Sequence, residues 1–265
     1  NRATNFDTAI IYNVAGTIGN IAGDFIGNIG DIIYNNGDSI GNITGDFINN
    51  FSENKESIIN NREQSIIGDI TGNFIENSRA IGNYGSIDNI TGYFGGNSTY
   101  TSYYGGYTSG GAICNYGTIK DITGYFINNH IDDGASGGAI GNGGFIDNIT
   151  GDFVGNYAYD NNSGYYSDAF GGAISNSGVI KNITGNFINN HVSADSSEYY
   201  YNENKPKIPY TEAMGGAIYN NGGIQNLTGN FIGNYATIND LDENSKAYGG
   251  AIASVVGNLN DTIEI

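Results

Sequence analysis

The sequence of 265 residues has little of several residue types that shape common folds. It contains 1 Cys, 2 Pro and no Trp, and its 9 basic residues stand against 27 acidic ones, for a formal net charge of −18. A single cysteine cannot form an intrachain disulfide, so a disulfide framework is excluded. The shortage of Lys and Arg argues against binding to nucleic acid or to anionic membranes, because both need basic clusters that replace counterions.

Long apolar stretches and a leader segment are missing as well. No run approaches the about 18 apolar residues that a transmembrane helix needs. The chain opens with NRATNFDTAI, which has neither a basic start nor an apolar segment. We therefore expect a mature or excised segment of a longer gene product.

What is abundant is Gly, with 43 residues, and Asn, with 42, which together make up about a third of the chain. Such a composition is compatible with disorder, but 38% hydrophobic residues and 21 Tyr argue otherwise. The order of the residues decides the question, because they form a repeat.

A phrase of the form T-G-x-F-x-x-N, with Ala22 in place of the Thr in the first copy, occurs eight times, and we number each repeat from its Phe as position 0. Position −7 is always Ile, position −4 is Ile or once Leu227, position −2 is always Gly and position +3 is always Asn. The Phe residues are Phe25, Phe47, Phe74, Phe94, Phe126, Phe153, Phe187 and Phe231. The Asn residues at +3 are Asn28, Asn50, Asn77, Asn97, Asn129, Asn156, Asn190 and Asn234.

A second anchor precedes each Phe: an Ile followed two residues later by Asn, as in Ile113 and Asn115. This Ile lies 13 residues before the Phe in the last five repeats and 14 or 15 before it in the first three. From the Phe to the next anchor Ile the distance instead varies between 7 and 31 residues. Each repeat therefore has a rigid part and one elastic part.

This pattern predicts an all-β fold, a right-handed parallel β-helix of about eight coils, each with about 20 core residues. Short segments rich in Ile, Thr and Phe, punctuated by Gly and Asn, favour strands and tight turns over helices. We expect three strands per coil, of the forms A-I-x, x-I-x and I-T-G-x-F, with right-handed crossovers. Residues 1–265 would form one domain, with 253–265 as a degenerate last coil or a cap.

Stacking of the coils assigns a place to each repeated position. Ile at −7 and −4 and Phe at 0 should point inward, and Gly at −2 should make room between them. The Asn positions should lie at turns, where Asn tolerates the left-handed conformation, and their amides should hydrogen-bond from coil to coil as ladders.

Five copies of G-G-A-I accompany the eight F-x-x-N phrases, the first at 110–113 and the last at 249–252. Together they resemble the GGAI and FxxN repeats of chlamydial polymorphic outer membrane proteins and, more broadly, the β-helical passenger of an autotransporter. The resemblance implies a secreted adhesin-like stalk, displayed on the bacterial cell surface and carried by a C-terminal membrane barrel. No such barrel occurs in this sequence, and one Cys is few for the chlamydial members.

Catalytic and metal sites find little support in the repeat. At position −6, Asp88, Lys120, Asp147 and Lys181 alternate in sign, which predicts an exposed ladder of charges and, as the weaker alternative, a catalytic Lys. Asp24 and Asp46 at −1 are interpreted as solvated acids and not as a catalytic dyad. His130 and His191 lie two coils apart, too far to share one ion, and the nonapeptide of calcium-binding β-helices is absent. We therefore predict a non-enzymatic protein without cofactor or metal.

All long insertions fall between Asn at +3 and the next G-G-A-I, so they should project from one edge of the solenoid, where binding sites usually lie. They contain 14 of the 21 Tyr, together with Ser, Gly and Asn, which is the composition of adaptable recognition loops. The alternative, without a role in binding, is that the tyrosine rings only pack on one another and cover the edge of the solenoid. The candidate binding residues are Tyr100, Tyr103, Tyr104, Tyr107, Tyr165, Tyr166, Tyr199, Tyr200, Tyr201 and Tyr210.

Three functions follow from these features. The first is an extracellular passenger stalk that presents Tyr-rich loops to a host or neighbouring-cell protein or glycan. The second is a structural subunit that stacks end to end with copies of itself into a fibre. A carbohydrate-active enzyme is third, because 9 Lys and Arg hardly supply a groove of clustered acids and bases.

Overall fold

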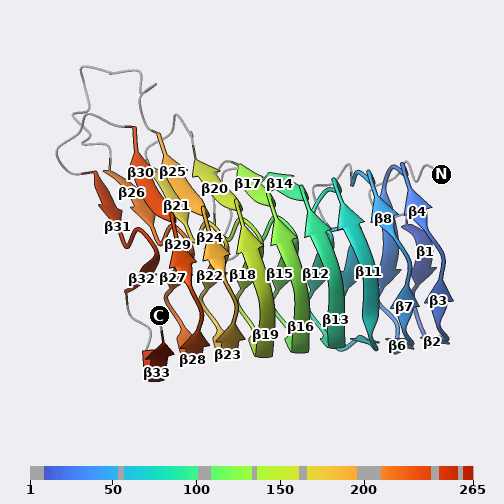
Figure 1. Cartoon of the computed structure of the whole chain (residues 1–265). Helices are drawn as coiled ribbons and strands as arrows, with labels where there is room; N and C mark the ends of the chain where they lie inside the picture. The colour runs from blue at the N-terminus through green and yellow to red at the C-terminus, as the bar shows by residue number, and fades with distance from the viewer. Residues whose placement is uncertain are drawn as a thin grey trace, which may run out of the picture.

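The computed structural model describes residues 9–52, 57–100, 109–132, 136–160, 166–195, 210–239, 245–255 and 259–264. Within these ranges the chain forms parallel strands and no helix. Successive coils are displaced along one axis, from the blue N-terminal coil to the red C-terminal one (Figure 1). The predicted parallel β-helix is confirmed.

Sheet 1 contains the A-I-x strands, one from each coil, and has nine strands. Equivalent residues are paired directly, as in Ile113 with Ile140 and Asn115 with Asn142. The strands are β1 (Ala9–Asn13), β5 (Asp31–Asn35), β9 (Ile59–Asn61), β12 (Ile81–Asn83), β15 (Ile113–Asn115), β18 (Ile140–Asn142), β22 (Ile174–Asn176), β27 (Ile218–Asn220) and β32 (Ile252–Ser254).

Sheet 2, with sixteen strands, holds both remaining strand types of the repeat. In the first coils these are separate short strands: β2 (Thr17–Ile18), β3 (Ile21–Ala22), β4 (Phe25–Ile26), β6 (Ser39–Ile40), β7 (Ile43–Thr44), β8 (Phe47–Ile48), β10 (Ile66–Ile67) and β11 (Ile70–Ile75). In the middle and last coils they are β13 (Ser86–Gly95), β16 (Thr118–Ile127), β19 (Phe145–Val154), β23 (Val179–Thr184), β24 (Phe187–Ile188), β28 (Gly223–Thr228), β29 (Phe231–Ile232) and β33 (Leu259–Glu264).

The prediction of three separate strands per coil is therefore wrong for five coils. In three of them the second and third strands merge into one strand of ten residues, and in the next two the second strand continues into the first two residues of the third. In the first three coils the second and third strands stay apart, and the residue at position −6, between them, is Gly19, Gly41 or Gly68. A side chain at −6, as in Asp88, accompanies continuous pairing. Glycine weakens strand interiors, which accounts for the difference.

Inward positions build one continuous core between sheets 1 and 2. The eight Phe rings form a single stacked column, with neighbouring ring centroids 4.8 to 5.0 Å apart. This spacing equals the distance between paired strands, so each ring lies directly over the ring of the previous coil. The six rings from Phe47 to Phe187 are completely buried.

Gly at −2 serves a purpose other than the predicted one of making room between Ile and Phe. A Cβ at Gly151 would lie 1.8 Å from the carbonyl oxygen of Gly124 in the preceding coil, and at Gly185 it would lie 1.7 Å from that of Gly151. The backbones thus approach so closely that only glycine fits at this position.

The left-handed turn residue is at +2 and not at the predicted position +3. Position +2 has positive φ in all eight coils, from Gly27 at 64° to Glu76 at 52° and Asn189 at 55°. This turn directs the following Asn inward, where it is buried in the first seven coils and partly buried, as Asn234, in the last one. The side-chain amide of each Asn at +3 donates to the side-chain oxygen of the next, and the predicted ladder is confirmed.

A second buried ladder joins the Asn residues that end the strands of sheet 1, from Asn13 to Asn220. At its end Asn220 donates to the hydroxyl of Ser254. Beyond this ladder, β32 and β33 extend sheets 1 and 2 as a ninth coil. The pairing of β33 with β28 shifts register between Ile224 and Asn226.

Two further sheets arise from the elastic part of the repeat. Sheet 3 consists of β14 (Ser98–Tyr100), β17 (His130–Asp132), β20 (Tyr157–Asp160), β25 (His191–Ala194) and β30 (Tyr235–Ile238). Sheet 4 consists of β21 (Tyr166–Phe170), β26 (Tyr210–Met214) and β31 (Lys246–Tyr248). Sheets 3 and 4 together are called the wing, and they lie toward the C-terminal half (Figure 1).

Candidate binding surface

The insertions leave the β-helix and return to it through the strands of the wing. In the coils of Phe153, Phe187 and Phe231 the chain runs outward in sheet 3 and back in sheet 4. Both sheets stay parallel and in register from coil to coil, as in the pairing of Ala158 with Val192. The insertions therefore share one side of the solenoid, as the repeat predicts, and their first and last residues are ordered strands.

A second small core holds the two wing sheets together. It is formed by Ile131, Ala158 and Val192 from sheet 3 with Ala169 and Ala213 from sheet 4, and all five are completely buried. Alternate residues of the outgoing strands are apolar, as β strands with one buried face require. The wing is thus a packed element and not an unstructured loop.

The G-G-A-I phrase is the base of the wing. The second glycine of the phrase is Gly138 in one coil and Gly172 in the next. A Cβ added to Gly138 would lie 2.5 Å from the backbone oxygen of Tyr157, and one added to Gly172 would lie 2.5 Å from the backbone nitrogen of His191. The turn into sheet 1 thus passes directly against the backbone of sheet 3, which leaves no space for a side chain. The sequence of the first three coils has no G-G-A-I, and their described residues contribute no strand to sheet 4.

Arg79 covers the N-terminal end of the wing. Its guanidinium donates to the carbonyl oxygen of Gly110 at 2.9 Å, to the hydroxyl of Thr99 at 3.3 Å and to that of Ser109. It stands at position +5, which holds the inward Ile131 and Ala158 in later coils. A polar side chain with one backbone and two hydroxyl partners thus closes the apolar column.

A column of stacked aromatic rings follows the outer face of sheet 3 at position +4. His130, Tyr157, His191 and Tyr235 lie one above the other, with centroids 4.8, 5.2 and 4.8 Å apart. Desolvation lowers the pKa of His191, opposed by the backbone carbonyl of Asn189, and desolvation together with Asp132 raises the pKa of Tyr157. Imidazole and phenol groups thus form one ribbon along the wing.

The two histidines are separated by the ring of Tyr157, as the spacing of the repeat predicts. Among the described residues no group of three His, Cys, Asp or Glu is arranged to hold a metal ion. Cys114 is buried in sheet 1, where desolvation raises the pKa of its thiol.

Sheet 4 carries a short row of charges. Asp168 pairs with Glu212, which pairs with Lys246, and the Glu212 backbone N–H donates to the Asp168 carboxylate at 3.1 Å. Burial raises the pKa of Asp168 to about 6, with smaller contributions from Glu212 and Asp160. The wing therefore carries a carboxyl that changes charge near neutral pH.

A shallow cleft of about 470 Å³ lies where the wing begins. Phe51, Glu76, Ser98 and Asp132 contribute to its lining, and Phe51 is 58% exposed. The cleft exists because sheet 3 starts at β14, while the coil of Phe74 returns to sheet 1 after seven residues.

Three of the ten candidate Tyr residues, Tyr100, Tyr166 and Tyr210, belong to wing strands, and the backbones of Tyr166 and Tyr210 are paired. The others fall outside the described residues, and they are Tyr103, Tyr104, Tyr107, Tyr165, Tyr199, Tyr200 and Tyr201. The spacing of the repeat places His130, Tyr157 and His191 at the same position in successive coils, but sequence reasoning did not predict that these rings stack, together with Tyr235, into one column.

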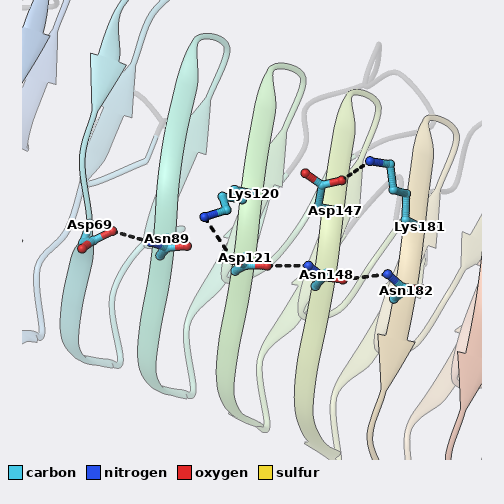
Figure 2. Close-up of polar contacts among 8 residues, drawn as sticks. All are labelled: Asp69, Asn89, Lys120, Asp121, Asp147, Asn148, Lys181 and Asn182. Atoms are coloured by element: carbon cyan, nitrogen blue, oxygen red, sulfur yellow. Dashed lines mark hydrogen bonds and ion pairs between the residues drawn. The ribbon is translucent and has the colours of Figure 1, made fainter.

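The outer face of sheet 2 carries rows of polar side chains (Figure 2). At −6, Lys181 forms an ion pair with Asp147 across coils, while Lys120 lies 3.9 Å from Asp121 of its own coil. The predicted ladder of alternating charge thus forms only in part.

At −5, the amide of Asn89 donates to Asp69, that of Asn148 to Asp121 and that of Asn182 to Asn148 (Figure 2). Asp24 and Asp46 are joined by a bond from the Asp46 backbone N–H to the Asp24 carboxylate, at an exposed edge.

The described residues contain no helix that could span a membrane. In comparisons with protein-family models, curated proteins and solved structures, the chain matches none of them.

Proposed function

We propose that this chain is a non-catalytic, extracellular protein of the bacterial cell surface, an adhesin-like stalk of the autotransporter passenger type. The observation that supports it is the wing: the irregular spans of successive coils leave and re-enter a rigid solenoid on one side. Loops on a rigid scaffold are the usual place for recognition. The net charge of −18 favours a soluble, solvated surface.

The binding partner in this proposal is a protein or glycan on the surface of another cell, contacted by the Tyr-rich spans between the wing strands. Tyr, Ser, Gly and Asn supply large contact area and adaptable hydrogen bonds at low entropic cost. The longest span between described strands joins β25 to β26 and includes Tyr199, Tyr200 and Tyr201. Removal of this span is therefore the most direct test of the proposed contact.

The test measures binding of fluorescently labelled chain to epithelial cell monolayers. A variant with residues 196–209 replaced by a short Gly-Ser linker should lose at least tenfold in binding, while its thermal unfolding stays close to that of the wild type. Replacing 53–56 in the same way is the matched control, because that segment lies outside the wing. Cells treated with protease or with periodate distinguish a protein from a glycan partner. Wild-type chain that fails to bind, or a 196–209 variant that binds normally, contradicts the proposal.

A fibre subunit is the second candidate. Ile26 and Ile232, both at position +1 in the first and last F-x-x-N coils, are 60% and 57% exposed, whereas Ile48 and Ile188 of coils between them are less exposed. Apolar side chains at the outer coils favour stacking of copies. Sedimentation velocity separates the candidates: a stalk remains monomeric at rising concentration, and a fibre subunit elongates.

A further inference from the structure

Three Asn-Gly dipeptides occur in the sequence, and all of them lie at the end of a strand of sheet 1 or in the turn that follows it. They are Asn36–Gly37 after β5, Asn142–Gly143 at the end of β18 and Asn221–Gly222 after β27. In this dipeptide the backbone nitrogen of the glycine can attack the side-chain amide of the asparagine, because glycine has no Cβ to hinder the approach. The same reactive pair thus occurs in three different surroundings.

The reaction is an intramolecular substitution followed by hydrolysis. The deprotonated glycine nitrogen attacks the side-chain carbonyl carbon Cγ, and the new bond closes a five-membered succinimide ring. The bond from Cγ to Nδ2 breaks, and the side-chain nitrogen takes up a proton and leaves as ammonia. Water then opens the ring at either carbonyl, which yields aspartate or isoaspartate. Water is the only co-reactant.

Asn142 is locked in the second buried ladder and is completely buried. Its side-chain amide donates to the side-chain oxygen of Asn176 at 2.7 Å, and its own side-chain oxygen accepts from Asn115 at 2.8 Å. The attacking nitrogen, that of Gly143, donates to the backbone carbonyl of Asn115 at 2.7 Å. Ring closure would leave several of these buried groups unpaired, so the structure protects this dipeptide.

Asn221 is exposed, but the nitrogen that would attack it is restrained. The backbone N–H of Gly222 donates to the side-chain oxygen of Asn220 at 3.3 Å. A Cβ at Gly222 would lie 2.1 Å from the carbonyl oxygen of Gly178 in the preceding coil, so backbone packs directly on backbone here. Gly222 must break a hydrogen bond before it can react, which slows the reaction.

Asn36 has neither restraint. It is exposed, and its side chain forms no hydrogen bond with any described residue. The backbone N–H of Gly37 also donates to none of the described residues. The atoms nearest to a Cβ at Gly37 belong to the side chain of Asn13, whereas Gly222 has backbone at this place. The amide of Asn36 can therefore rotate toward a nitrogen that is not engaged.

The length of the turn explains this difference. The turn after β5 has three residues, 36–38, whereas the turns after β12, β15, β18, β22 and β27 have two. In the shorter turns the second residue donates to the carbonyl of the preceding coil, as Gly117 does to Asn83 and Gly178 to Asn142. In the longer turn only Asn36 donates to the carbonyl of Asn13, so the N–H of the next residue stays unbonded.

We propose that Asn36 is a site of spontaneous deamidation, at which the folded protein slowly converts Asn36–Gly37 to aspartyl and isoaspartyl forms. The product has one more negative charge, and isoaspartate also inserts the Cβ of residue 36 into the backbone. The inserted atom lies between the bond from Asn36 to the Asn13 carbonyl and the bond from Asp38 to the Gly16 carbonyl. The first two coils therefore lose their register at this turn. The modification is independent of the wing and of any partner bound there.

The experiment follows the three dipeptides in the whole folded chain by peptide mapping and mass spectrometry during incubation at mildly alkaline pH. Asn36 should deamidate about tenfold faster than Asn221, the ratio that corresponds to the hydrogen bond of Gly222. Asn142 should stay unmodified. The rate at Asn36 should rise with pH, because the attacking nitrogen must lose its proton. Methylation by an isoaspartyl methyltransferase identifies the isoaspartate.

The same chain unfolded in urea is the matched control, because it keeps the three dipeptides and removes their surroundings. There the three sites should react at similar rates. Asn36→Gln should abolish the fast reaction of the folded chain, since glutamine would have to close a larger ring, and Asn221→Gln should leave it unchanged. An Asn36 that reacts no faster than Asn221 in the folded chain, or an Asn142 that reacts as fast as Asn36, would overturn the proposal.

The loss of register has a separate test. Asn36→Asp has the charge of the product without the inserted backbone atom, and it should unfold at nearly the same temperature as the wild type. The isoaspartyl form, isolated by anion exchange, should unfold at a lower temperature. An isoaspartyl form as stable as Asn36→Asp would overturn this consequence.

Discussion

The side-chain amide of Asn129 donates a hydrogen bond of 3.0 Å to the side-chain oxygen of Asn156, one coil further along the axis, and both residues are completely buried. The same oxygen of Asn156 also accepts from the Asn129 backbone N–H, and the Asn129 amide donates to the Phe94 carbonyl. One amide thus satisfies backbone and side-chain groups of neighbouring coils.

Asn129→Ala should lower the free energy of unfolding by about 3–5 kcal/mol, because it leaves several buried polar groups unpaired and each costs about 1–3 kcal/mol before relaxation. Urea denaturation measures the loss. Asn226→Ala is the control, since Asn226 donates to Asn182 on the exposed face, and it should cost less than about 0.5 kcal/mol. Equal effects of the two substitutions would contradict a buried ladder.

Gly151→Ala should prevent the coils from packing at their normal spacing. The added Cβ would meet the Gly124 carbonyl oxygen at 1.8 Å, and stacked backbones on both sides leave no space to relax. We expect loss of more than about 4 kcal/mol or failure to fold. Gly19→Ala, where a Cβ meets nothing within 4 Å, should be nearly neutral. Thermal unfolding followed by circular dichroism compares them.

Asp168→Asn should stabilise the protein at neutral pH. The folded-state pKa of Asp168, about 6, lies above its ordinary value of 3.8. The folded state therefore binds this proton more tightly than the unfolded state, and the associated stability, complete below pH 3.8, is lost as pH rises through about 6. The variant should exceed the wild type by about 1–3 kcal/mol at pH 7 and by nothing at pH 3.5.

The measurement is urea denaturation of both proteins across this range. The difference between them isolates Asp168 from Glu212, whose pKa is also raised, and from His191, whose pKa is lowered. A stability difference that does not change with pH would show that the carboxyl is not desolvated in the wing.

Arg79→Ala should loosen the wing and leave the main core intact. It removes the hydrogen bonds to Gly110, Thr99 and Ser109, which should cost about 2 kcal/mol locally. Hydrogen exchange followed by mass spectrometry should show faster exchange in 98–100 and 109–113 and unchanged exchange around Phe126. Lys120→Ala, at an exposed position, should leave all of these segments unchanged.

The repeat predicts the architecture well because its invariant side chains have no freedom once the coils stack. Ile at −7 and −4, Phe at 0 and Asn at +3 each occupy one column in the structure. The turn was harder to predict, because φ at +2 is imposed on Gly, Asn and Glu alike. The identity of the residue there does not reveal it.

The candidate sites show the limit of sequence reasoning more clearly. The segment after Asn at +3 has no invariant residue. The only sequence signal for the strands of the wing is the alternation of inward residues, such as Ala158 with Asp160 or Val192 with Ala194, and this signal is too short to predict strands. Arg62 lies over the rings of both Tyr34 and Tyr84, which occupy different positions of the repeat, and only the three-dimensional structure shows that these side chains meet.

The central claim is that equivalent positions of successive coils lie directly over one another, whatever the length of the insertion between them. Spin labels on the exposed Thr residues at −3, placed in a Cys114→Ser background, test it by pulsed electron paramagnetic resonance. The pairs Thr44–Thr150, Thr44–Thr184 and Thr44–Thr228 span four, five and six coil steps. The distances between label sites should be about 19, 24 and 29 Å, rising by one strand spacing per coil. Distances that grow instead with the number of inserted residues would contradict the stacked solenoid and the wing built upon it.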